Sequence, residues 1–349
     1  MNKIYETIKT AKLSHKNKVS DSIAKFGNIE ILEYANNNNE DDHNAIAEYG
    51  ACIYDTFIWS KEILEPFELI IWKKTIKKEM SLGKNIYNMA RLYRIDDFSE
   101  LRDCAKKYNI KYFDCSNPNK FQELEKYAKI DNSSSPSSFS SSCPNLIITI
   151  MGTGMRSGKF TTTMILREEL NKYFNIGMVG TEPQSPLCGI DEMVIPQLIP
   201  LHTVAPAIWG AINKVNSKNK NLDAIIVSSQ TGIYSNPLDI GTGRGGGVVS
   251  LAILLGSKPD YIILASHTVN IEEIKKNIEA IELLSGKKVI GITINSKNMD
   301  LKQAELKNRL NDISNKLNIP VAELIKKINF EEFINCMVDI IRNHKKIKI

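Results

Sequence analysis

Long apolar runs are missing from this chain, and no stretch approaches the ~20 residues that a membrane-spanning helix needs. The N-terminal residues Met1 to Tyr5 mix polar and apolar types and contain no signal-peptide core. We therefore expect a cytoplasmic protein without a membrane partner.

Cysteine is scarce and scattered, with six residues in a chain of 349. No Cys-x-x-Cys pair occurs, which argues against the ligand spacing that is typical of zinc and iron–sulfur sites. Widely separated thiols in a chain of this size suit a reducing compartment, in agreement with the expected cytoplasmic location.

Excess charge is also small, since 45 Lys and Arg residues stand against 40 Asp and Glu residues and give a net charge of +5. A nucleic-acid-binding surface needs a clustered basic stripe with interleaved aromatic residues, and the sequence shows no such stripe. We expect no nucleic-acid partner and favour an anionic small molecule as the substrate.

One low-complexity segment divides the chain. Residues 131–144 are rich in serine and have no apolar pattern that could bury a core, which is typical of a flexible linker. A chain of this length favours two domains over one. We predict an N-terminal domain over residues 1–130, a linker over 131–144 and a C-terminal domain over 145–349.

A glycine-rich turn follows the first apolar run after the linker. Leu146–Met151 is apolar and β-branched, Gly152–Thr163 contains the turn, and a helical pattern extends to Tyr173. Strand, glycine loop, lysine and helix together predict a P-loop, in which backbone N–H groups, the helix N-terminus and the lysine attract phosphate. A flexible surface loop with a chance Gly-Lys pair is the alternative, and the flanking strand and helix favour the phosphate site. We assign phosphate or nucleotide binding to Gly152, Thr153, Gly154, Gly158, Lys159, Thr161 and Thr162.

The loop differs from the common P-loop motif in two ways. Its outer glycines, Gly152 and Gly158, lie one residue further apart, and Phe160 stands where the common motif has Ser or Thr. Because Phe160 cannot coordinate magnesium, we expect Thr161 to be the metal ligand, with Thr162 as the alternative, unless the metal is held weakly. The longer loop resembles the Gly-Thr-rich P-loops of dethiobiotin synthetase and its relatives.

Both domains alternate strand and helix patterns, which predicts an α/β protein with parallel sheets. The N-terminal domain is expected to be a small Rossmann-like domain with strands over Asn28–Leu32, Phe67–Trp72 and Lys111–Asp114 and a helix over Phe98–Tyr108. No Gly-x-Gly-x-x-Gly follows these strands, so a nicotinamide cofactor is not expected there. The C-terminal domain is expected to be a doubly wound parallel sheet with the phosphate loop after its first strand. Its expected strands are Leu146–Met151, Ile176–Val179, Ala224–Val227, Tyr261–Ala265 and Val289–Ile294, and its expected helices cover residues 161–173, 203–215, 271–284, 303–317 and 330–343.

Polar residues follow the later strands of the C-terminal domain, and in a doubly wound sheet these positions converge on the ligand. Glu182 can accept a proton from an amine or hold a metal, and His267 can act as a base. We predict that Glu182, Gln230 and His267 are catalytic, and that the amide of Asn295 pairs with an adenine edge. Capping or ordinary solvation of a strand end is the alternative for each residue.

A second glycine-rich stretch, Asp239–Val248, contains Gly-x-Gly-x-x-Gly but does not directly follow a strand. A dinucleotide site there is only weakly supported. A mobile loop is one alternative, and an anion-binding turn that opens a helix over Val248–Leu255 is the other. In the second case Arg244 would bind a substrate carboxylate or phosphate with its planar guanidinium group.

These motifs resemble those of the D-glutamate N-acetyltransferase-like P-loop family, formerly a domain of unknown function. The phosphate loop matches that family at three pairs of positions. Three later segments are similar to the family's Glu-Gly-Gln-Gly-Ser-Leu signature with its His-Pro, to its Leu-Leu-His-Gly-x-x-Pro-Asp segment and to its Ala-Leu-Asn strand end. The matching positions are Gly152-Thr153, Gly158-Lys159, Thr161-Thr162, Ser228–Ile233 with Asn236-Pro237, Leu254–Leu264 and Ile292–Asn295.

The resemblance implies a Rossmann-like domain followed by a P-loop domain, and transfer of an acetyl group from acetyl-CoA to an amino acid such as glutamate. The chain departs from the family at Gly154, Ser228 and Asn236, where the family has Asp, Glu and His. Two other functions stay open: an ATP-dependent ligase of the dethiobiotin-synthetase kind, which activates a carboxylate by phosphorylation, and nucleotide binding without catalysis, which the missing acids favour. The expected cofactor is ATP or acetyl-CoA, with Mg²⁺ as a further candidate, and we expect a homo-oligomer.

Overall fold

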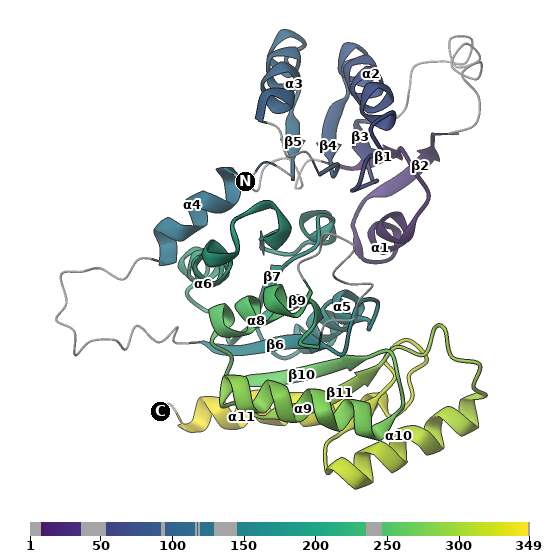
Figure 1. Cartoon of the computed structure of the whole chain (residues 1–349), viewed down its shortest axis with the longest axis vertical. Helices are drawn as coiled ribbons and strands as arrows, with labels where there is room; N and C mark the ends of the chain where they lie inside the picture. The colour runs from purple at the N-terminus through teal and green to yellow at the C-terminus, as the bar shows by residue number, and fades with distance from the viewer. Residues whose placement is uncertain are drawn as a thin grey trace, which may run out of the picture. The chain divides into compact units, whose positions relative to one another are not determined.

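The computed structural model of the chain describes residues 8–35, 54–91, 95–115, 117, 119–128, 145–234 and 246–347. They form two compact units (Figure 1). The N-terminal unit comprises Met1–Lys120 together with Pro183–Ile190, and the P-loop unit comprises Phe121–Glu182 together with Asp191–Ile349. The serine-rich segment 131–144 lies outside the described residues.

The N-terminal unit is built on a five-stranded sheet in the order β2-β1-β3-β4-β5, in which every neighbouring pair is parallel. This order is that of a doubly wound, Rossmann-like sheet, as predicted. The strands are β1 (Thr10–Leu13), β2 (Glu30–Tyr34), β3 (Thr56–Trp59), β4 (Asn85–Asn88) and β5 (Tyr112–Asp114), and the helices are α1 (Lys18–Phe26), α2 (Glu68–Ser81) and α3 (Ile95–Lys107).

The predicted strand over Phe67–Trp72 is wrong, because these residues enter helix α2. An apolar run of this length suits a buried strand equally well, and the burial pattern distinguishes the two. Trp72, Ile76 and Met80 are fully buried at helical spacing, whereas Ile70 is 74% exposed. The period is therefore that of an amphipathic helix rather than of a strand.

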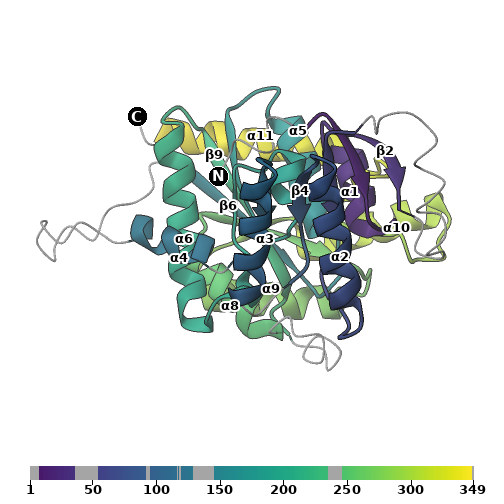
Figure 2. The ribbon, with the colours of Figure 1, turned by 90° about the horizontal axis from the view of Figure 1, so that it is seen from above.

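The P-loop unit is built on a seven-stranded, wholly parallel sheet in the order β12-β11-β10-β6-β9-β7-β8. The prediction of a doubly wound parallel sheet is confirmed, with α5 and α11 on one face and α8 and α9 on the other (Figure 2). The strands are β6 (Leu146–Gly152), β7 (Ile176–Gly180), β8 (Glu192–Met193), β9 (Ala224–Gly232), β10 (Tyr261–Ser266), β11 (Val289–Ile294) and β12 (Val321–Ala322). The helices are α4 (Asn119–Ala128), α5 (Lys159–Leu170), α6 (Leu201–Lys218), α8 (Gly246–Ser257), α9 (Ile271–Ser285), α10 (Gln303–Leu317) and α11 (Phe330–Ile347), and α4 joins this unit from Phe121 onward. Of two short 3₁₀ turns, η6 (Pro196–Leu198) belongs to this unit and η5 (Ser185–Cys188) to the N-terminal unit.

Strand β9 extends five residues beyond the predicted end at Val227 and reaches Gly232. The polar run Ser228–Gly232 is predicted to leave the sheet, yet all nine residues of β9 are buried. Ser228 pairs with Ile150 and Gly232 with Gly152, with a register shift between them. The third strand therefore carries polar side chains along the phosphate-loop strand itself.

No helix of the described residues is both long enough and apolar enough to cross a membrane.

Candidate functional site

The glycine-rich loop connects β6 to α5 at the carboxyl edge of the sheet. Gly158 adopts the left-handed backbone conformation with φ of 95°, and Arg156 has φ of 60°. Residues other than glycine seldom adopt positive φ. Glycine at position 158 therefore favours the left-handed backbone conformation by itself, whereas Arg156 needs other contacts to keep its positive φ. No side chain caps the N-terminus of α5, which leaves the loop and the partial positive charge of the helix facing the same edge.

Lys159 lies buried inside the loop. Its Nζ donates hydrogen bonds to the carbonyl oxygen of Gly154, at 2.7 Å, and to Oγ of Ser157, at 3.2 Å. A Cβ added to Gly152 would lie 2.7 Å from Lys159 Nζ and 2.6 Å from Ser157 Oγ. Gly152 is therefore required for the lysine to lie across the loop.

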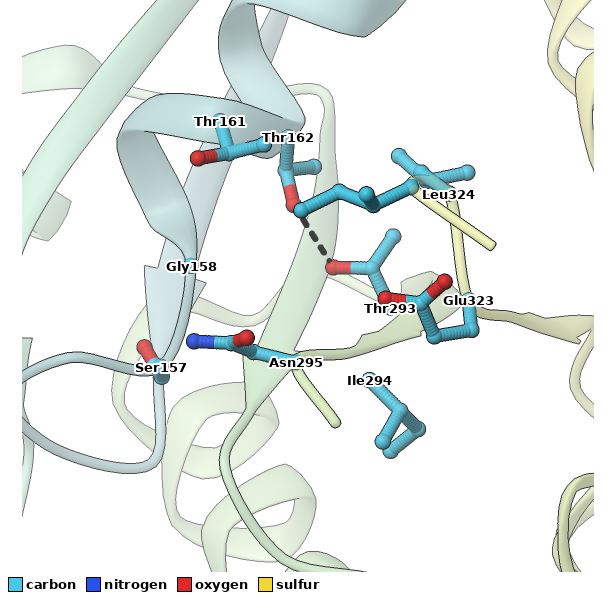
Figure 3. Close-up of a pocket in the computed structure, with 10 residues that line it drawn as sticks. Ser157, Gly158, Thr161, Thr162, Thr293, Ile294, Asn295, Glu323 and Leu324 are labelled. Atoms are coloured by element: carbon cyan, nitrogen blue, oxygen red, sulfur yellow. Dashed lines mark hydrogen bonds between the residues drawn. The ribbon is translucent and has the colours of Figure 1, made fainter. Parts of the chain in front are cut away.

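A pocket opens beside the loop, with an empty volume of about 270 Å³ counted out to the solvent (Figure 3). Its walls come from the start of α5, the end of β11 and the segment after β12. The lining residues are Ser157, Gly158, Thr161, Thr162, Thr293, Ile294, Asn295, Glu323, Leu324 and Ile325. The apolar side chains of this set are Ile294, Leu324 and Ile325, and its Ser157 and Gly158 belong to the loop.

The predicted base-reading residue Asn295 borders this pocket, but its amide group already has partners. Its Nδ2 donates to the carbonyl oxygen of Arg156, at 2.7 Å, and its Oδ1 accepts the N–H of Lys297, at 3.3 Å. The first bond holds Arg156, the non-glycine residue of the loop that has positive φ. In this conformation Asn295 stabilises the phosphate loop directly.

We expect Asn295→Ala to weaken ATP and inorganic tripolyphosphate binding equally, by about fivefold, because one loop hydrogen bond contributes about 1 kcal/mol. Calorimetric titration of both ligands measures this. A loss confined to ATP would show instead that Asn295 binds the base. Asn298→Ala removes an exposed asparagine three residues later and serves as the control, with both affinities unchanged.

The structure brings His267 to the first residues of the loop. Its Nδ1 lies 3.0 Å from Oγ1 of Thr153, and the N–H of Thr153 donates to the carbonyl oxygen of Ala265 in β10. A Cβ added to Gly154 would lie 3.3 Å from Cε1 of His267. The exposed imidazole is thus positioned at the edge of the phosphate loop, where a base could reach a bound ligand.

Gln230 and Glu182 lie on the other side of the loop, at the ends of β9 and β7. Gln230 is buried, and its Nε2 donates to the carbonyl oxygen of Thr181, the residue before the half-buried Glu182. A Cβ added to Gly232 would lie 2.5 Å from the carbonyl oxygen of Thr153. The end of β9 therefore packs directly on the start of the loop.

The three threonine hydroxyl groups near Lys159 have different surroundings. Thr161 is half-buried and lines the pocket, the Oγ1 of Thr162 is 2.8 Å from the Oγ1 of Thr293, and the Oγ1 of Thr163 donates to the carbonyl oxygen of Lys159. Among the described residues, no group of three or more His, Cys, Asp or Glu side chains is arranged to hold a metal ion.

Arg244 lies outside the described residues. Sequence reasoning missed several residues that the structure places at the site. Glu323 and Leu324 follow a strand of only two residues, which has no periodic signal, and Gln197 lies in a short 3₁₀ turn 33 positions before its partner Gln230. Only Ser157 had a signal, because it lies within the glycine-rich loop itself.

The family model described as "Domain of unknown function (DUF1611_C) P-loop domain" matches residues 137–332. No curated protein sequence matches this chain. A crystal structure of a DUF1611 family protein from Anabaena variabilis is similar, with a TM-score of 0.65 and 15% identity, over 97% of this chain and 100% of that chain. A nucleotide-binding protein in complex with ADP from Archaeoglobus fulgidus has a TM-score of 0.34 and 12% identity, over 59% of this chain and 85% of that one. The MinD cell division protein of Aquifex aeolicus has a TM-score of 0.36 and 14% identity, over 58% and 97%.

Proposed function

Since the chain belongs to the DUF1611 P-loop domain family, we propose that its loop Gly152–Lys159 binds the phosphates of a nucleotide or of acetyl-CoA. The observation that carries the proposal is the buried Lys159, whose ammonium group is held in the loop by the carbonyl oxygen of Gly154. A phosphate oxygen is a stronger acceptor for a desolvated ammonium than a carbonyl oxygen. The uncapped N-terminus of α5 adds N–H groups and partial positive charge at the same place.

An adenine ring as the second part of the ligand would lie in the open space beside the loop, largely outside the enclosed part of the pocket, which is small. Ile294, Leu324 and Ile325 offer apolar contacts, and Gly158 belongs to both the pocket and the loop. ATP and acetyl-CoA both link adenine to a chain of phosphates, so both fit a ring site that adjoins a phosphate site.

The reaction we propose is acyl transfer to an amino acid such as glutamate, as the resemblance to D-glutamate N-acetyltransferases implies. The amine nitrogen attacks the thioester carbonyl, a C–N bond forms and the C–S bond breaks. The proton of the amine passes to Glu182 and from there to the departing sulfur, so that coenzyme A leaves as its thiol and Glu182 returns to its carboxylate form. His267 is the alternative base, and Gln230 orients the strand-end segment through Thr181. Arg244 remains the proposed contact of the anionic substrate.

A protein that binds nucleotide without catalysis is the second candidate. Two acids of the resembled family are replaced in this chain, by Ser228 and Gly154. Ser228 is buried within β9, so no carboxylate reaches the loop from that position. The ATP-dependent ligase of the dethiobiotin-synthetase kind is the third, and it needs a phosphoryl acceptor in addition to ATP.

Titration calorimetry with ATP and with acetyl-CoA, followed by incubation of each with glutamate and mass spectrometry of the products, tests the proposal. Acyl transfer predicts binding of acetyl-CoA and formation of N-acetylglutamate. A ligase predicts ADP release that depends on a carboxylate substrate, and the non-catalytic protein predicts binding with neither product. Absence of binding by both ligands would refute the phosphate site itself.

We expect magnesium to change the ATP affinity by less than about tenfold. The usual hydroxyl ligand is replaced by Phe160, and within the described residues no group of three or more His, Cys, Asp or Glu side chains is arranged to hold a metal ion. ATP titrations in excess Mg²⁺ and in EDTA measure this. An ATP affinity that rises more than a hundredfold with Mg²⁺ would show that a further residue coordinates the metal. Loss of that rise in Glu182→Gln or Thr161→Val would identify which residue it is.

Four statements remain predictions from the sequence. They are the domain boundaries at residues 130 and 145, the cytoplasmic location, the homo-oligomeric state and the absence of nucleic-acid partners.

A further inference from the structure

Helix α2 of the N-terminal unit is apolar on two opposite faces at its start. Trp72 and Ile76 are fully buried and define the face that packs into the core of the unit. On the other face, Ile70 is 74% exposed, Ile71 is 55% exposed, and Phe67 just before the first turn is 68% exposed. A helix that packs on one side needs apolar residues on that side alone, so the fold of the unit does not account for these three side chains.

The outward faces of the other helices in this unit are charged where the structure describes them. α1 exposes Lys18, Asp21 and Lys25, and α3 exposes Arg102 and Lys106. The exposed apolar side chains are thus particular to α2. A contiguous apolar patch with a polar rim typically marks a surface that contacts a partner.

The exposed residues of α2 share one side of the helix. Positions 67, 70, 71, 74 and 78 are separated by three or four residues, which is the spacing of neighbours on a helix surface. All five are exposed. This side is apolar near the start of α2 and basic near its end. Its members, called the outer face of α2 below, are Phe67, Ile70, Ile71, Lys74 and Lys78.

The charges around α2 are separated along its axis. The acidic residues at its start are Glu62, Glu65 and Glu68, and the basic residues of its second half are Lys73, Lys74, Lys77 and Lys78. Glu68 pairs with Lys61 within the chain. Glu65, Lys74 and Lys78 are exposed and have no ion-pair partner among the residues that the structure describes. This order of charges suits the helix dipole, but the dipole does not explain the apolar residues beside them.

A second copy of the chain in antiparallel orientation complements this pattern. A two-fold axis that crosses the outer face between Ile70 and Ile71 sets Ile70 of one copy against Ile71 of the other. The same axis sets Phe67 against the aliphatic part of the Lys74 side chain. Glu65 then lies beside the basic end of α2 in the second copy, so opposite charges meet on both sides of the apolar contact.

Two other partners could contact an apolar and basic surface, but they match it less well. An anionic lipid surface would attract Lys74 and Lys78 and would repel the acidic start of α2. The exposed apolar side chains lie at that acidic end rather than among the lysines. An acidic peptide would be repelled at the same place, so the separation of charges favours a partner with the reverse order.

We propose that the outer face of α2 is a self-association surface, on which two copies of the chain pack α2 against α2 in antiparallel orientation about a two-fold axis. The inference is independent of the phosphate site. It gives the homo-oligomer that the sequence predicts a defined surface.

Sedimentation velocity on the full-length chain, from about 1 µM to about 100 µM, tests the surface. We expect a dimer whose dissociation constant rises at least 30-fold in Ile70→Asp, because a charge then lies at the centre of the contact. Leu283→Asp is the matched control. Leu283 lies in α9 and is 85% exposed, more than Ile70, and its variant should dimerise like the wild type. A monomeric wild type, or a dimer that Ile70→Asp leaves intact, would overturn the proposal.

Phe67→Asp separates loss of the dimer from loss of the fold. Phe67 stands at the N-terminus of α2, where no side chain caps the helix, and aspartate is a preferred residue at that position. The variant should therefore keep the circular dichroism of the wild type while its dimer weakens at least tenfold. Wild-type dimerisation of Phe67→Asp would contradict the proposed contact.

Charge reversal tests the antiparallel orientation. Lys78→Glu and Glu65→Lys should each weaken the dimer by about threefold, the scale of an exposed ion pair. The two changes combined in one chain exchange acid and base across the contact, so the double variant should dimerise more tightly than either single variant. Losses that add in the double variant would rule out the antiparallel arrangement.

Co-sedimentation with liposomes of phosphatidylcholine and phosphatidylserine tests the lipid alternative. We expect the wild-type chain to stay in the supernatant. Binding to the liposomes by a chain that is monomeric in solution, with loss of that binding in Ile70→Asp, would assign the outer face of α2 to a membrane and overturn the proposal.

Discussion

Replacing Lys159 with alanine is expected to weaken ATP or acetyl-CoA binding by about 2–4 kcal/mol, or roughly 30- to 1,000-fold. The side chain is buried in the loop and faces its carbonyl groups, so the substitution removes one member of a desolvated pair with phosphate. The fold should persist, with Tm within about 3 °C of the wild type, because the lysine does not contribute to the apolar core. Calorimetry and thermal unfolding measure the two effects.

Lys172→Ala is the matched control for this variant. Lys172 lies just beyond the other end of α5, where it is exposed and pairs with Glu169. Lys172 carries the same charge as Lys159, but we expect the Lys172→Ala variant to bind ATP or acetyl-CoA with an affinity within twofold of the wild type. If both variants lose affinity equally, the effect is caused by the change in net charge. If Lys159→Ala binds with the same affinity as the wild type, the interpretation of the loop as a phosphate site is wrong.

The phosphate loop was predictable from sequence because each of its parts has a local signal. The apolar strand Leu146–Met151, the glycines and Lys159 are contiguous, and the structure places them as β6, the turn and the first residue of α5. The order of strands in the sheet of the P-loop unit was not predictable in the same way, since strand order depends on contacts between distant segments.

The two main errors have distinct physical causes. The six-residue apolar run Phe67–Trp72 predicts a strand because so short a run does not reveal its period, and the helical spacing emerges only when Ile76 and Met80 are included. The sequence predicts too early an end for β9 because Ser228–Gly232 is polar, although the strand is buried throughout. Polar residues inside a buried strand are difficult to predict, because they are satisfied by tertiary contacts or by ligands.

The candidate site shows the same division between local and distant signals. Asn295 was found because it ends a strand, but its bond to the carbonyl oxygen of Arg156 joins residues 139 positions apart. The direction of the Gln230 amide likewise depends on Thr181, 49 positions earlier. Sequence reasoning thus identified residues at the site without the contacts that define what each of them does.

Gly232→Ala is expected to lower ATP affinity at least tenfold, although residue 232 carries no functional group. The added Cβ would lie 2.5 Å from the carbonyl oxygen of Thr153 and 3.0 Å from the backbone nitrogen of Gly154. The opposite side of Thr153 is fixed, because its N–H donates to the carbonyl oxygen of Ala265, at 3.0 Å. The loop must shift to relieve the overlap, and overpacking of this kind typically costs 1–3 kcal/mol.

Gly177→Ala provides the contrast that makes this prediction specific to the loop. Its added Cβ would lie 2.8 Å from both Cδ1 of Leu222 and Cγ1 of Val215, so the strain falls on the ends of two side chains beside α6. We expect Gly177→Ala to lower Tm while ATP affinity stays within twofold of the wild type. Gly232→Ala should do the reverse, with a large loss of affinity for a comparable or smaller change in Tm. If the two variants lose affinity in proportion to their loss of Tm, global stability rather than the position of Thr153 controls binding, and the contact of β9 with the loop has no separate role.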